Sequence, residues 1–109
     1  MGSIQLSTRT EELVDALFSA EERETARKLL EDHCGTNLPF LSDLDPSQLE
    51  RYRFAAIKVS QGVLKGLESA IALARTDWRD LLMKADFGHD TQAHERWCAS
   101  TLRAAGSAL

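Results

Sequence analysis

The chain has 109 residues, of which 43% are apolar and 28% charged, and its net charge is −4. This length predicts one domain spanning residues 1–109, with short flexible ends near 1–7 and 106–109. The composition excludes a disordered chain, and no run approaches the ~20 apolar residues of a membrane span. The start has no signal-peptide pattern, and two distant cysteines do not form a disulfide framework. We therefore expect a soluble cytoplasmic protein.

Charge is distributed unevenly along the chain. Residues 1–50 carry four basic and eleven acidic side chains, a net −7, whereas residues 51–109 carry nine basic and six acidic ones, a net +3. Two interpretations stay open. Either the halves attract each other inside one fold, or a surface that carries both positive and negative charge steers a charged partner.

The first third of the chain predicts two helices, over about 10–18 and 20–34. Apolar residues recur at helical spacing in both segments. Ser19 and Glu22 have the spacing of a capping box, which predicts that the second helix begins directly after Ser19.

An irregular apolar connection is expected over residues 36–45, which include Phe40 and Leu41. Loops normally run over the surface, so this apolar segment either covers the core or is exposed and binds a partner. Asp45 and Pro46 then mark the start of a helix over 46–60, with Asp45 as its cap. That helix has apolar residues on both sides, which is typical of a central helix.

The strongest periodic signal is a stripe of apolar residues in steps of three and four. Its members are Leu64, Leu67, Ile71, Ala74, Trp78, Leu81 and Ala85. The stripe predicts one long helix over 62–86, with a new helix start at Thr76–Asp77 as the alternative. Asp90 is expected to cap a last helix over 91–104. No window shows strand alternation, so we predict an all-α fold, a compact bundle of about five helices.

The segment Arg51–Ser60, followed by Asp-Trp-Arg-Asp at 77–80, resembles a set of short, uncharacterised bacterial all-helical proteins. The likeness covers the middle third of the chain. It implies a helical protein of the bacterial cytoplasm, and it implies no catalytic residues.

A metal site is the sharpest chemical hypothesis. His94 and Cys98 lie four residues apart, so both point the same way on a helix, and His33 and Cys34 end another helix. Together they would supply a tetrahedral zinc set, although no short Cys-x-x-Cys turn pre-forms it. The alternative is two histidines and two thiols that pack in the core.

Cys98 and His94 could also form a thiolate–imidazolium pair for nucleophilic catalysis. No glycine-rich turn supplies an oxyanion hole, and the chain has no phosphate-binding loop or hydrolase motif. We therefore expect no enzyme, no cofactor and no resident metal, and we keep a metal- or thiol-dependent role for Cys98 and His94 as an alternative.

The remaining hypothesis is a protein-interaction or regulatory accessory module, with an unknown protein or a second copy as partner. Tryptophan and arginine, as in Trp78–Arg79, are enriched in interfaces. The basic residues Arg51, Lys58 and Lys65 are spaced seven apart, but they are too sparse to make nucleic-acid binding more than a second alternative. The candidate interface residues are Phe40, Leu41, Phe54, Arg51, Lys58 and Arg79.

Overall fold

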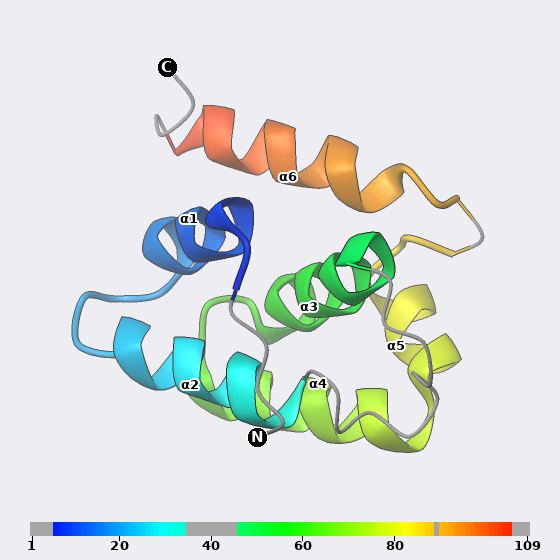
Figure 1. The fold of residues 1–109 in the computed structure, drawn as a ribbon, viewed down its shortest axis with the longest axis horizontal. Helices are drawn as coiled ribbons and strands as arrows, with labels where there is room; N and C mark the ends of the chain where they lie inside the picture. The colour runs from blue at the N-terminus through cyan, green and yellow to red at the C-terminus, as the bar shows by residue number, and fades with distance from the viewer. Residues whose placement is uncertain (1–5, 35–45, 89, 106–109) are drawn as a thin grey trace.

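The computed structural model describes residues 6–34, 46–88 and 90–105, which form six helices and no strand (Figure 1). The helices are α1 (Thr8–Leu17), α2 (Arg23–His33), α3 (Pro46–Ser60), α4 (Leu64–Thr76), α5 (Trp78–Lys84) and α6 (Ala93–Ala104). The predicted all-α class is confirmed, with six helices in place of about five. Among these helices, none combines the length and apolar character needed to cross a membrane.

Helix α3 runs through the middle of the bundle and packs against α1, α4, α5 and α6 (Figure 1). Its bounds are those predicted from the sequence. Four consecutive residues, Phe54 to Ile57, have no exposed surface, so solvent reaches no side of the helix there. The prediction of a central helix is therefore confirmed. The predicted Asp45 cap and the connection over 36–45 lie outside the described residues.

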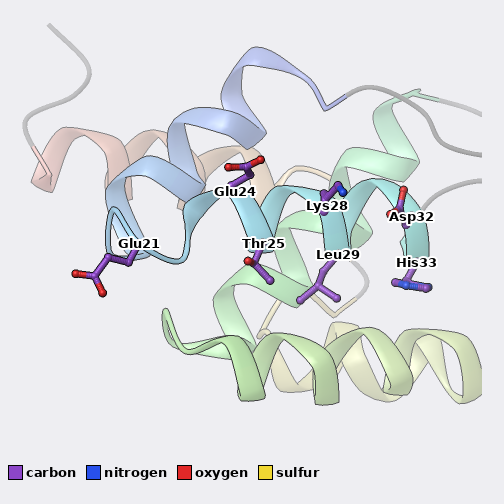
Figure 2. A pocket seen from close by; sticks show the side chains of 7 residues that line it. All are labelled: Glu21, Glu24, Thr25, Lys28, Leu29, Asp32 and His33. Atoms are coloured by element: carbon purple, nitrogen blue, oxygen red, sulfur yellow. The ribbon is translucent and has the colours of Figure 1, made fainter.

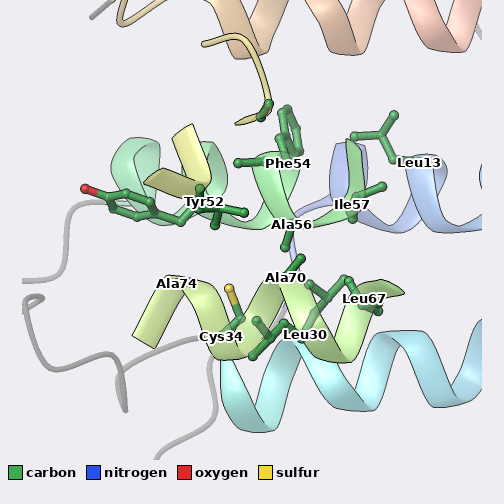
Figure 3. Packing of buried hydrophobic residues seen from close by; sticks show 14 of the residues in the cluster. Leu13, Leu30, Cys34, Tyr52, Phe54, Ala56, Ile57, Leu67, Ala70 and Ala74 are labelled. Atoms are coloured by element: carbon green, nitrogen blue, oxygen red, sulfur yellow. The ribbon is translucent and has the colours of Figure 1, made fainter. Parts of the chain in front are cut away.

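Small residues bring α4 close against α3. Ala56 and Ala70 face each other across the two helices in Figure 3, and both are buried. Gly66 lies where α4 passes the end of α3, and a Cβ there would come within 2.6 Å of the Ser60 carbonyl oxygen. Gly62, with φ +78°, makes the left-handed turn between the two helices. The α3–α4 pairing therefore depends on residues without bulky side chains.

The predicted starts of the first two helices are wrong by a few residues. Ser7 caps α1, because its hydroxyl oxygen accepts the Thr10 N–H at 3.2 Å. Leu6, which lies before the cap, is only 7% exposed and belongs to the hydrophobic core. Helix α2 begins at Arg23 because the Ser19 backbone carbonyl, not its hydroxyl, accepts the N–H groups of Glu22 and Arg23. The capping box is therefore not formed.

The single helix predicted over 62–86 is also wrong. Asp77 leaves helical geometry, with φ −154° and ψ 79°, and its carboxylate accepts the Asp80 N–H at 3.2 Å. The alternative start near Thr76–Asp77 is the one observed, because this cap satisfies an N–H of a new first turn. The last helix begins at Ala93, two residues later than predicted, since the Asp90 carboxylate binds the Gln92 N–H in a preceding turn.

Candidate protein-interaction surface

The short helix α5 is anchored on one side and bare on the other. Leu81 and Leu82 are buried against the bundle, and the Trp78 ring meets the Tyr52 ring of α3 edge-on at 5.8 Å. Met83 points the other way and is 63% exposed. A helix of seven residues cannot stand alone, so these anchors hold the Met83 face in a fixed position.

A hollow of about 170 Å³ opens on this surface. Its walls come from α5 and from the turn that follows it; they are Trp78, Arg79, Leu82, Met83 and Gly88. We call these five residues the α5 surface. Four of them are apolar or lack a side chain, so the hollow offers a mainly apolar floor with one cation beside it.

Two arginines define the charge around the hollow. The Arg79 guanidinium lies over the Trp78 ring, 5.2 Å from the ring centroid, in a cation–π contact at the surface. Arg51 reaches from α3 and donates to the Gly88 carbonyl oxygen at 2.7 Å. Arg51 therefore fixes the turn, whereas Arg79 stays exposed beside the hollow.

The candidate interface residues do not form one surface. Phe54 is fully buried, so its prediction as a partner contact is wrong; it belongs to the core because α3 is enclosed on all sides. Lys58 also turns inward, with its ammonium 5.2 Å from the Phe87 ring centroid. Phe40 and Leu41 lie outside the described residues. Of the four candidates that the structure describes, Arg79 alone lines the α5 surface.

The sequence reasoning missed Met83, Leu82 and Gly88 as surface candidates. Met83 falls outside the Leu–Trp stripe, and an apolar residue off the stripe of an amphipathic helix was the available signal. Gly88 has φ +50°, and nothing in the linear pattern places it against α5. Its position depends on the fold of the turn.

The alternative site at His94 and Cys98 is sealed inside the bundle. Both side chains are 1% exposed, which leaves a substrate no route to either group. Burial lowers the pKa of His94 and raises the pKa of the Cys98 thiol to about 11. A thiol with that pKa carries almost no thiolate at neutral pH, so the geometry does not favour a nucleophile.

The four residues of the zinc hypothesis do not come together as one ligand set. His33 lies exposed at the end of α2, whereas Cys34 is buried directly after it. Across the described ranges, no three histidine, cysteine, aspartate or glutamate side chains gather in a position to hold a metal ion.

A second hollow, of about 270 Å³, runs along the outer face of α2 (Figure 2). Its lining is mostly charged or polar, namely Glu21, Glu24, Thr25, Lys28, Leu29, Asp32 and His33. Side chains of this kind are expected on a solvated helix face, so this hollow indicates no particular ligand.

Comparison of the chain with protein-family models, curated proteins and solved structures finds no match. The resemblance to short bacterial proteins therefore stays a prediction.

Proposed function

We propose that this chain is a small helical protein-interaction module, a regulatory accessory that binds its partner through the α5 surface. The observation that carries the proposal is Met83, 63% exposed beside the hollow and next to the Trp78–Arg79 pair. Two free, buried cysteines support a reducing compartment, and we place the module in the cytoplasm.

The residue types of the α5 surface suit binding. Methionine is flexible and polarizable, and it adapts to irregular partner surfaces. Tryptophan and arginine are enriched among residues that contribute most to interface energy. The hollow has room for an apolar side chain of the partner, and an acidic group beside it would pair with Arg79.

The partner is a second copy of this chain or another protein, and one experiment distinguishes them. A photo-reactive amino acid is placed at position 83, in cells that naturally make the protein, and at Val63 as the matched control. Val63 is 54% exposed at the start of α4 and lines no described hollow, so it reports chance encounters. We expect a discrete cross-linked species at position 83 and none at position 63.

The same pair of sites gives a test in purified protein. Light scattering is measured for the wild type, for Met83→Glu and for Val63→Glu. A dimer that only Met83→Glu dissociates identifies the second copy as partner. A monomer that cross-links another protein at position 83 in cells identifies a foreign partner. A monomer with no adduct at position 83, or with equal adducts at both positions, overturns the proposal.

A further inference from the structure

His94 is a buried imidazole whose two ring nitrogens have no hydrogen-bond partner among the described residues. It lies on α6 with 1% of its surface exposed, between the rings of Phe54 and Phe87, whose centroids are 5.6 and 6.2 Å from its own. Both ring nitrogens are themselves buried. A neutral ring fits between two aromatic side chains, but an imidazolium there lacks acceptors for its two N–H groups.

Charged groups on the neighbouring helices do not compensate for this burial. The titratable and charged side chains around the inner face of α6 are Arg9 and Glu12 on α1, Glu50, Arg51 and Lys58 on α3, and Glu95 and Cys98 on α6. Burial has the largest effect on the His94 pKa and lowers it. Glu95 and Glu50 oppose this shift, whereas Arg51 and Arg9 add to it.

Helix α6 lies at the edge of the bundle, beside α1 and α3 (Figure 1). It packs on α1 and α3. The polar ties described between them are weak: Arg9 and Glu95 are 3.9 Å apart and both exposed, and the Lys58 ammonium lies 6.0 Å from the Trp97 ring centroid. Docking of α6 therefore depends mainly on its buried inner face, which carries His94, Cys98 and Leu102.

We propose that α6 is a pH-operated latch: when His94 takes up one proton from solvent, α6 leaves α1 and α3. Release uncovers Phe54 and Leu13, which point toward α6 in Figure 3. The inference is independent of the α5 surface, and it assigns a role to a buried group that the proposed interaction does not use.

The direction of the pH dependence follows from the pKa difference between the two states. In the closed state, with α6 packed on α1 and α3, burial lowers the pKa of His94. In the open state, with α6 released, the pKa of His94 returns to its ordinary value of about 6.5. Protons therefore bind the open state more tightly. The closed state keeps its full stability above about pH 6.5, and the opening equilibrium rises by up to about tenfold for each pH unit below it.

Hydrogen exchange resolved by helix tests the latch. Protection factors, corrected for the intrinsic pH dependence of exchange, are compared for α6 and α4 between about pH 7 and about pH 5. We expect the α6 factors to fall by up to about tenfold per pH unit below about pH 6.5 while those of α4 stay constant. His94→Phe should remove the fall, and His33→Gln, at an exposed histidine, should retain it, as should His89→Gln.

Two outcomes overturn the latch. One is constant α6 protection in the wild type, or an equal fall in every helix. The other is a fall that persists in His94→Phe. If that variant does not fold, NMR titration of the wild-type imidazoles decides: His94 must titrate below the ordinary range and together with the loss of α6 protection. Titration at the ordinary value with α6 still protected counts against the proposal.

Discussion

Arg53 closes the end of α2 from inside the protein. Only 2% of its surface is exposed, and its Nε donates to the Cys34 carbonyl oxygen at 2.8 Å. A terminal nitrogen also reaches the Leu30 carbonyl at 3.5 Å. Burial lowers the pKa of Arg53, whereas Glu31 raises it. The last carbonyl groups of a helix need partners, and this guanidinium supplies them across the helix interface.

Replacing Arg53 with methionine removes the hydrogen bond to the buried Cys34 carbonyl oxygen, whereas the Leu30 carbonyl oxygen keeps the Cys34 N–H at 3.1 Å. We expect Arg53→Met to lower the free energy of unfolding by about 2 kcal/mol. Arg75→Met is the control, because Arg75 is exposed on α4 and its replacement should change stability little. Urea denaturation of both variants measures the difference, and equal midpoints would contradict the assigned role.

The two cysteines should behave as inert core residues. Burial raises the pKa of Cys34 to about 12 and that of Cys98 to about 11. We expect neither thiol to react with an aromatic disulfide reagent in the native state at neutral pH, and both to react in denaturant. A thiol that reacts rapidly in the folded protein would show that its pocket opens, and would revive the thiol alternative for Cys98.

At the scale of elements, the turn between α3 and α4 depends on Gly62. Its φ of +78° disfavours a side chain, and a Cβ would clash with the Leu17 carbonyl oxygen at the end of α1. Gly88 also has a positive φ, +50°, but nothing lies within 4 Å of an added Cβ. Both glycines therefore have a left-handed backbone, but only at Gly62 would an added side chain also clash with a neighbouring group.

Alanine at each glycine separates the two effects. Gly88→Ala should lower the free energy of unfolding by about 1 kcal/mol, because a residue with a side chain is strained in the left-handed conformation. Gly62→Ala should cost about 1–3 kcal/mol more, because the Leu17 carbonyl must move. Thermal or urea unfolding measures both. Equal losses would mean that α1 yields to the extra methyl group.

The sequence predicts α3 correctly because its start signal at Pro46 and its apolar residues on both sides agree. It favours one continuous helix and offers the break at Asp77 only as the alternative, because the apolar spacing from Ala74 through Trp78 continues across it. Periodicity reports which residues are buried, not whether the backbone between them is continuous. The α5 surface escapes prediction for a related reason: the hollow exists only after the turn at Gly88 folds beside Met83.

At the scale of the whole molecule, the uneven charge along the chain is only partly used inside the fold. Glu31 acts on Arg53 across the two halves. Several ion pairs join residues of the same half instead: Arg9–Glu50, Arg27–Asp15 and Arg96–Asp90. Attraction between the halves therefore contributes at Arg53, and a surface of both charges that steers a charged partner stays a prediction.

The two tryptophans report from different parts of the bundle, Trp78 on α5 and Trp97 on α6. Trp97 packs against Phe54 and Phe87, so its fluorescence follows the docking of α6. Trp78→Phe leaves only Trp97, and Trp97→Phe leaves only Trp78. Near pH 7 we expect the fluorescence of both variants to follow the loss of helical circular dichroism in urea, because one core unfolds as a unit.

Near pH 5 the two reporters should diverge. Fluorescence of the variant that keeps Trp97 should change at lower urea than its circular dichroism, because protonated His94 weakens the docking of α6 alone. Fluorescence of the variant that keeps Trp78 should still coincide with its dichroism. Divergence already at neutral pH would mean that α6 is never part of the cooperative unit. Coincidence of both reporters near pH 5 would mean that protonation destabilises the bundle evenly, which leaves α6 with no separate response to acid.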